Sequence, residues 1–269
     1  LKIRGGKEML IFDEKKYAEN IINNKRYETV KTQGRERCVL VRYLTSLNYS
    51  VEEIKKVLLE IPMSGGEYLS SKDKDMIFSK IIAKANEYEF ITNKVVKIYQ
   101  SELDIIEQVE DDYARHLLFI YLVYYKWAST VSHLQFYSKK NDIMMVTENN
   151  NDVWKLAGLS KLRVADRYRL CNLLFNKGLY KIDNFKVHNY IYIPFVKDDG
   201  DVAIEISNFD NILGELLIYE KPTEYKRCVV CNAVIKKTRS PKKYCINCAY
   251  KENLRKTKER KRGLKTQAS

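Results

Sequence analysis

The hydrophobic residues of the first hundred positions recur at intervals of three and four, which is the period of amphipathic helices. Four helices are predicted, marked by the apolar sets Tyr17, Ile21 and Ile22; Val39, Leu40, Tyr43 and Leu44; Ile54, Val57, Leu58 and Ile61; and Ile77, Ile81 and Ile82. Ser50 and Glu53 have the spacing of a capping box, so the third helix is expected to begin after Ser50. Pro62 and the pair Gly65-Gly66 are expected to end it. Residues 1–100 are therefore predicted to form a helical N-terminal region.

The next region, residues 101–196, is predicted to continue with helices and to end in a β-hairpin. One long helix is expected over 103–127, followed by a polar loop that ends at Asp152. Asp152 is predicted to cap a short helix, and the turn Gly158-Leu159-Ser160 leads into a longer helix over about 162–177. The apolar stripe of that longer helix is predicted to contain Val164, Tyr168, Cys171, Leu174 and Phe175.

Glycine and alternating residues mark the end of this region. Gly178 is expected to close the long helix in the left-handed conformation. A strand from Leu179, a turn at Asp183-Asn184 and a second strand over 186–195 are then expected, because Ile191, Ile193 and Phe195 alternate with polar residues. Residues 197–225 are interpreted as a connector with a strand near 201–206 and a helix near 211–219.

The order helix, short helix, turn, longer helix and β-hairpin resembles the winged helix-turn-helix family over about ninety residues. The resemblance implies DNA binding, with the longer helix in the major groove. It also implies that base edges are contacted by polar residues of that helix, namely Arg163, Arg167, Arg169 and Asn172. Arginine reads guanine and asparagine reads adenine by paired hydrogen bonds. Winged helices also serve as protein-interaction modules, and that alternative stays open.

A second resemblance concerns the stretch ERCVLVRYLTSLNYSVEEIKKVLLEI, residues 36–61, with the loop and helix that follow it. It is similar to the small helical domain found C-terminal to phage and plasmid primases. The resemblance implies a role in replication rather than in transcription. A generic helical hairpin explains the same pattern and remains the alternative.

Four cysteines stand in two pairs near the C-terminus, Cys228 with Cys231 and Cys245 with Cys248, with thirteen residues between the pairs. This spacing predicts one tetrahedral zinc ion held by four thiolates in a structural role, because no ligand position is left for water. Val234 and Ile235 are expected to lie in a hairpin whose turn is Ser240-Pro241. Asn232 follows the second cysteine, where a left-handed residue is expected, and asparagine tolerates that conformation.

A helix-forming stretch without glycine or proline follows Cys248, so residues 226–250 resemble the treble-clef and zinc-ribbon fingers. Members of that group bind nucleic acid or protein. Disulfides or a redox pair are the alternatives to a metal, but disulfides are disfavoured in a cytosolic chain. The two remaining cysteines, Cys38 and Cys171, are predicted to be core residues.

Charge is distributed very unevenly along the 269 residues. Residues 226–265 hold fifteen of the 48 basic residues and two of the 35 acidic ones, a surplus of thirteen that equals the net charge of +13. Such a block attracts polyanions, and we expect nucleic acid as the partner. A solubilising tail is the alternative, and an anionic membrane surface is disfavoured because no apolar face is expected beside the charge. The predicted contact residues are Lys236, Lys237, Arg239, Lys242, Lys243, Arg255, Lys258 and Arg262, the last three in a basic helical tail over 251–269.

Motifs for catalysis are scarce. The three histidines have no ligand spacing, and no phosphate-binding GxxxxGK[ST] loop, GxSxG or HExxH motif occurs. A metal-dependent nuclease could use Asp210 with Glu224 and Lys226, but acid-x-Lys also occurs elsewhere in this lysine-rich chain. An adaptor or inhibitor that binds a host or phage protein could use an aromatic surface around Tyr121, Tyr124, Tyr125 and Trp127.

The sequence thus predicts a mainly α fold with small β elements: a helical N-terminal region, a winged helix and a C-terminal zinc finger with four cysteine ligands. The expected function is non-enzymatic DNA binding in replication or transcription control. The excess of Lys, Asn, Ile and Tyr suggests an AT-rich phage or bacterial mobile element, and a cytoplasmic location in the host is expected. The longest apolar run, Leu117 to Tyr125, is shorter than the roughly 20 residues of a membrane helix. Residues 1–8 read like a translated ribosome-binding site, so Met9 is a candidate start.

Overall fold

A computed structural model describes most of the chain. The described residues are 11, 13–27, 33–63, 68–87, 90, 95–131, 151–185, 188–238 and 242–266, and only the backbone is described at 35, 130–131, 151, 182–185, 188–190 and 261–266. Met9, the Gly65-Gly66 pair, Arg239 and the Ser240-Pro241 turn lie outside the described residues, as does the polar loop before residue 151. The chain divides into two compact units, Leu1–Phe209 and Asp210–Ser269, which are treated separately below.

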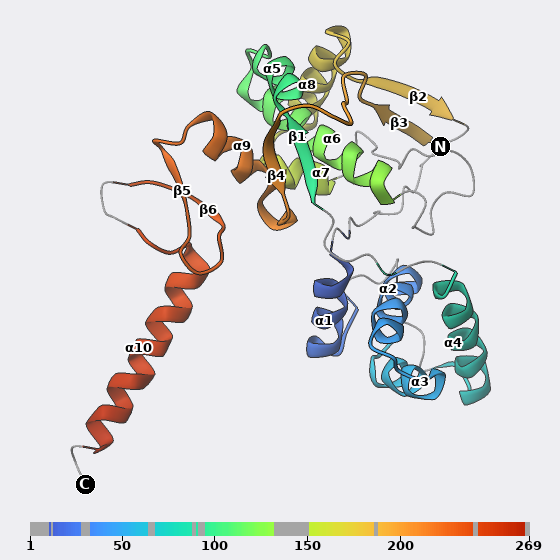
Figure 1. Cartoon of the computed structure of the whole chain (residues 1–269). Helices are drawn as coiled ribbons and strands as arrows, with labels where there is room; N and C mark the ends of the chain where they lie inside the picture. The colour runs from blue at the N-terminus through green and yellow to red at the C-terminus, as the bar shows by residue number, and fades with distance from the viewer. Residues whose placement is uncertain are drawn as a thin grey trace. The chain divides into compact units, whose positions relative to one another are not determined.

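The first unit begins with four helices: α1 Glu14–Asn24, α2 Gln33–Ser46, α3 Val51–Glu60 and α4 Ser71–Ala85 (Figure 1). The capping box predicted from Ser50 and Glu53 is confirmed: the Ser50 hydroxyl accepts from the Glu53 N–H, and the Glu53 carboxylate accepts from the Ser50 N–H at 2.7 Å. Ser70 and Asp73 form a second box at the start of α4. Each box satisfies N–H groups that the first helical turn leaves without a partner.

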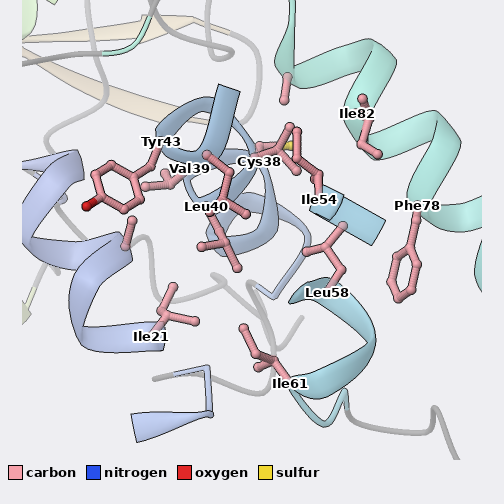
Figure 2. Packing of buried hydrophobic residues seen from close by; sticks show 14 of the residues in the cluster. Ile21, Cys38, Val39, Leu40, Tyr43, Ile54, Leu58, Ile61, Phe78 and Ile82 are labelled. Atoms are coloured by element: carbon pink, nitrogen blue, oxygen red, sulfur yellow. The ribbon is translucent and has the colours of Figure 1, made fainter. Parts of the chain in front are cut away.

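The four helices share one hydrophobic cluster (Figure 2). The stripe of α2 predicted from the sequence is buried as expected, and the α3 residues Ile54, Leu58 and Ile61 pack against it. In α4 the buried residues are Phe78, Ile82 and Ala85, whereas the predicted Ile77 and Ile81 lie at the edge of the cluster. The helix is therefore rotated slightly from the predicted face. Cys38 is buried in this cluster, which confirms its expected place in the core.

The long helix predicted over 103–127 is instead two helices, α5 Gln100–Glu107 and α6 Asp112–Val131. The break has a local cause in the acidic run before α6. The Asp111 carboxylate accepts hydrogen bonds from the N–H groups of Tyr113 and Ala114, at 2.9 and 3.0 Å, and so caps a new helix.

Helix α6 is the centre of the second part of this unit. Seven consecutive side chains, Leu117 to Val123, are fully buried. The proposed aromatic surface is wrong on this evidence, because Tyr121, Tyr124 and Trp127 are at most 1% exposed. Tyr125 is partly buried and meets Tyr192 edge to face. Tyr121, Tyr124 and Trp127 therefore serve packing and do not form the aromatic surface expected for a protein partner. None of the helices among the described residues is long and apolar enough to cross a bilayer.

A two-stranded sheet pairs a segment near the middle of this unit's sequence with one near its end. Strand β1, Val96–Tyr99, runs antiparallel to β4, Val202–Ile206. The strand at β4 was predicted, but β1 falls in the region predicted to be helical. Ile98 pairs with Ile204 and both are buried, so the sheet brings residues about a hundred positions apart into one core. The run Val96 to Tyr99, rich in β-branched and aromatic residues, was the local signal for this strand.

A buried ion pair links this sheet to the helices. The Lys126 ammonium group donates to both oxygens of Glu102, each at 2.9 Å, and to the carbonyl oxygen of Lys197. Glu102 is fully buried and also accepts the N–H groups of Tyr99 and Lys197. The lysine lies 4.2 Å from the centre of the Tyr99 ring. Every carboxylate oxygen therefore has partners, which is the condition under which a buried pair is tolerated.

Breaking this pair should destabilise the first unit strongly. Lys126→Met leaves a buried carboxylate without its cation, and we expect unfolding to require about 3–5 kcal/mol less. Urea denaturation would measure the change. The double variant Glu102→Gln/Lys126→Met should recover part of the loss. Lys25→Met is the control: its pair with Glu60 is 3.0 Å long but exposed, so less than about 1 kcal/mol is expected. Equal effects of Lys25→Met and Lys126→Met would contradict the argument.

Helices α7, Asn151–Leu156, and α8, Val164–Asn176, follow in the predicted order, and β2, Lys181–Phe185, pairs with β3, His188–Tyr192. Gly178 has a φ of 68°, which confirms its left-handed cap. The hairpin turn lies beyond Phe185 and not at Asp183-Asn184. The longer strands place Ile182 opposite Ile191, whereas the predicted turn would have placed it opposite Phe185.

A short 3-10 turn, Phe209–Asn211, contains the boundary between the units, and helix α9, Ile212–Glu220, is the first helix of the second unit. Two short antiparallel strands follow, β5 Tyr225–Arg227 and β6 Val234–Lys236, and then the long helix α10, Ile246–Thr266 (Figure 1). Helix α9 packs on the hairpin: Gly214 lies so close to Val234 that a side chain there would meet it. The Arg227 guanidinium donates to both Glu215 oxygens at 2.8 and 2.6 Å. The compact unit thus includes the helix expected in the connector.

Candidate metal centre and basic helix

The first cysteine pair lies in the tip of the β5–β6 hairpin. Strand β6 was predicted, but its partner precedes Cys228 and does not follow a turn at Ser240-Pro241. Two hydrogen bonds close the tip, from the Cys228 N–H to the Ala233 carbonyl at 2.8 Å and from the Asn232 N–H to the Cys228 carbonyl at 3.0 Å. Asn232 has a φ of 60°, which confirms the left-handed residue predicted there. This geometry turns the chain tightly enough to aim two sulfurs the same way.

The second pair opens helix α10, as predicted. Cys245 directly precedes the helix and its carbonyl accepts the Ala249 N–H at 2.8 Å, while Cys248 lies in the first turn. The hairpin tip is tied to this segment by a hydrogen bond from the Val229 N–H to the Lys243 carbonyl at 3.2 Å. The two cysteine pairs, which are thirteen residues apart in the sequence, are therefore brought close together.

The sulfur atoms of Cys228, Cys231, Cys245 and Cys248 all lie within 4.8 Å of one another, close enough to hold a metal ion. The Cys231 and Cys245 sulfurs are 3.6 Å apart. Four thiolates arranged tetrahedrally at zinc–sulfur distances of about 2.3 Å would be about 3.8 Å apart. The donor set and its spacing therefore fit zinc. No disulfide joins the cysteines among the described residues.

The surroundings of the sulfurs shift the pKa values of two thiols in opposite directions. Burial alone would raise the pKa of the Cys228 thiol, which is 1% exposed. Three backbone N–H groups oppose this by stabilising the thiolate, and the pKa falls to about 6. They belong to Cys231, Cys245 and Val230. Hydrogen bonding to the Cys231 sulfur, with burial next, raises the pKa of Cys248 to about 12. Without a cation the cluster therefore holds protons that a bound metal would displace.

No family model, curated protein or solved structure matches this chain. The resemblances noted in the sequence therefore rest on the residues themselves, and the chemistry of the chain has to be argued from its own geometry.

The basic residues around the cluster differ in their surroundings. Arg255 donates to both acidic residues of the tail, Glu252 at 2.7 Å and Glu259 at 2.7 Å. Lys236 lies 3.7 Å from Glu224, and Lys237 donates to the carbonyl of Pro222 at 2.9 Å. Lys242, Lys243 and Lys258 are exposed, while Arg262 lies on α10 where only the backbone is described. The predicted basic contacts are therefore brought onto one small unit, with part of their charge balanced locally.

Helix α8 presents a different face from the predicted one. Leu170, Cys171 and Leu174 are buried, which confirms Cys171 as a core residue. Val164, Tyr168 and Phe175 were assigned to the same stripe, but they are 66%, 52% and 48% exposed. The prediction was wrong because it took aromatic residues to be buried, whereas the helix packs against α6 through a neighbouring stripe.

The four polar residues predicted on this helix are not equivalent. Arg163 precedes the helix at its N-cap and its side chain is 85% exposed, and Asn172 is exposed. Arg169 is 56% exposed and reaches Asp111 at 3.1 Å. Arg167 instead donates to the Ser160 carbonyl at 2.7 Å and lies over the Trp154 ring, 5.2 Å from its centre. Arg167 therefore braces the turn between α7 and α8.

The sequence argument missed an exposed apolar stripe on α10. Ile246, Tyr250 and Leu254 are 88%, 65% and 44% exposed. Their spacing of four residues was the available signal, and the lysines around them concealed it. The expectation that no apolar face accompanies the basic charge is therefore wrong.

The acidic residues suggested for a nuclease show no metal site. Among the described residues, the four cysteines form the group of three or more ligating side chains that could hold a metal ion, and Asp210 and Glu224 do not belong to it. Glu224 pairs with Lys236 on the hairpin.

Proposed function

We propose that this chain is a non-enzymatic DNA-binding protein whose C-terminal unit is folded around one structural zinc ion. The observation that carries the proposal is the location of charge. The entire surplus of +13 lies in residues 226–265, a segment that includes the cysteine hairpin and most of helix α10. A duplex carries one negative charge per about 1.7 Å of its axis, so a helix of this kind gains affinity by displacing counterions.

The zinc would hold the hairpin tip to the start of α10. Its ligands would be Cys228, Cys231, Cys245 and Cys248, and the ion would supply the folding free energy that this short cysteine segment cannot obtain from apolar burial. Four sulfur ligands fill a tetrahedral ion, which is the arrangement of structural and not catalytic zinc. The protein itself would supply lysines from strand β6 and from the segment before α10, where phosphates can contact them.

Sequence preference would come from α8 in the first unit. The order of α7, α8 and the β2–β3 hairpin supports a winged helix-turn-helix, in which the second helix enters the major groove. The exposed polar residues predicted to read bases are Arg163 at the N-cap and Arg169 and Asn172 within the helix, and these have the chemistry to contact base edges. Arg167 is excluded from this role, because its guanidinium is held between the Ser160 carbonyl and the Trp154 ring. Arg163 and Arg169 form ion pairs with Asp166 and Asp111, but their side chains stay 85% and 56% exposed.

The experiment that tests the proposal is a selection of bound sequences from random duplexes at about 150 mM salt, where non-specific phosphate contacts are weakened. Recovery of one preferred sequence supports base reading by α8. Recovery of no bound DNA would contradict the proposed function and favour an adaptor that binds a protein.

Substitutions in α8 should remove preference without removing binding. For Arg163→Ala combined with Asn172→Ala, we expect a loss of about 1–3 kcal/mol of discrimination for each lost paired contact. Non-specific affinity, measured on a scrambled duplex, should barely change. Lys177→Ala, an exposed substitution at the end of the same helix, is the matched control and should keep the preference. Arg167→Ala should act differently and lower the melting temperature. Unchanged preference in the double variant would show that α8 does not read bases.

A further inference from the structure

The small C-terminal unit exposes more apolar surface than its charge would suggest. Val229 and Val230, in the hairpin tip, are each 67% exposed. On α10 the exposed side chains are Ile246, Tyr250 and Leu254, at 88%, 65% and 44%. Large apolar side chains are normally scattered on a surface, but these three recur every four residues and so share one face of the helix.

The acidic residues of α10 lie on another face. Glu252 and Glu259 are seven residues apart. Arg255 bonds to both, and the Lys256 ammonium lies 3.7 Å from the Glu252 carboxylate, so two cations balance the two acids away from the apolar residues. Leu254 instead has Lys251 three positions before it and Lys258 four positions after it, both exposed. The face of Ile246, Tyr250 and Leu254, called the stripe below, therefore combines apolar side chains with lysines and contains no acid.

The lysines of the stripe indicate a polyanionic partner. The apolar side chains beside them narrow the class of polyanion that fits. The phosphates and sugars of a duplex provide little apolar surface for contact with an apolar side chain. In the major groove, the apolar group available for contact is the thymine methyl. Unstacked bases expose their faces, and aromatic side chains stack on them in single-stranded nucleic acid. An anionic membrane would need a broad apolar face, whereas this helix is polar except for the stripe.

We propose that the stripe binds single-stranded nucleic acid, with Tyr250 stacking on a base and Lys251 and Lys258 contacting the flanking phosphates. The inference rests on the proposed function, because it gives the same basic unit a second, salt-insensitive mode of binding. The phosphate contacts weaken as salt rises, while the stacking contact does not depend on counterion release. The chain would then prefer a strand with accessible bases over a duplex at high salt.

The test compares the full zinc-loaded chain with Tyr250→Ala, Tyr250→Phe and Leu254→Ala on a single strand of about 20 nucleotides and on its duplex, between about 0.1 and 0.6 M salt. We expect Tyr250→Ala to weaken single-strand binding about 5- to 100-fold at every salt concentration, with an unchanged slope. Tyr250→Phe should keep most of the affinity, since it keeps the ring. The matched control is Tyr68→Ala, which removes a tyrosine that is 86% exposed in the other unit.

Three results would overturn the inference. Unchanged single-strand affinity in Tyr250→Ala means that the stripe does not contact bases, and equal losses on strand and duplex mean that it does not select accessible bases. If Tyr250→Ala instead lost binding to vesicles of phosphatidylcholine with phosphatidylglycerol and kept its oligonucleotide binding, the stripe would be a membrane-binding surface. The binding of the unaltered chain distinguishes failure of this inference from failure of the proposed function. If the unaltered chain binds neither the single strand nor the duplex, the proposed function fails as well.

Discussion

Removing the metal should unfold the cysteine hairpin and the start of α10 while leaving the helices of the first unit folded. Among the described residues of 225–250, no large apolar side chain is buried, so apolar burial contributes little to the folding of this segment. Structural zinc contributes apparent binding free energies of about 10–16 kcal/mol in small fingers. We expect one zinc per chain after purification without added metal. A chelator should abolish the slow hydrogen exchange of the amides of Cys228 and Asn232, which are hydrogen-bonded in the hairpin tip.

Substitution distinguishes ligation from general dependence on cysteine. Cys231→Ser should lower the zinc content and loosen the hairpin, since Cys231 is exposed and its replacement disturbs no core. Cys38→Ala and Cys171→Ala are the controls, because these buried cysteines lie in the first unit and should leave the zinc content at one per chain. Slow exchange that persists in residues 225–250 after complete metal removal would show that the segment folds without a metal.

Neutralising four exposed lysines of the C-terminal unit should remove about half of the salt dependence of DNA binding. If a third to a half of the fifteen bases contact phosphates, log affinity against log salt has a slope of about −4 to −7. Replacing Lys242, Lys243, Lys251 and Lys258 by Gln removes up to four phosphate contacts. We therefore expect the slope to become shallower by about 2 to 4. Titration of one duplex at several salt concentrations would measure it.

The matched control carries the same number of changes on the first unit, at the exposed residues Lys15, Lys16, Lys72 and Lys80. These lie on α1 and α4, and the rest of the chain is neutral, so the slope should stay within about 1 of the unaltered value. Equal changes of slope in both variants would mean that DNA binding depends on the overall charge of the chain. The C-terminal unit would then have no special part in binding. An unchanged slope in the first variant would leave the basic tail as a solubilising segment.

Local chemistry explains why several features could be predicted from the sequence. Ser50 caps α3 through a residue three positions away, and Gly178 and Asn232 adopt left-handed conformations that their own backbones permit. The cysteine pairs needed only their spacing, because two residues suffice to turn two sulfurs toward one ion. The location of the charge is likewise a property of composition. Each of these depends on residues within a few positions of one another, where propensity and hydrogen-bonding chemistry act directly.

Tertiary packing decided the rest. Strand β1 exists because β4, about a hundred residues later, supplies its hydrogen-bonding partner, and β5 was preferred over a segment after Ser240-Pro241 as the partner of β6. Tyr121 and Trp127 became core, while Tyr168 and Tyr250 stayed exposed, although nothing in their side chains distinguishes the two outcomes. Whether an aromatic residue faces solvent depends on which face of its helix packs against another element. By itself, the sequence determined most of the helices, the caps, the spacing of the metal ligands and the charge, and only the assembled elements decided which surfaces remained available for binding.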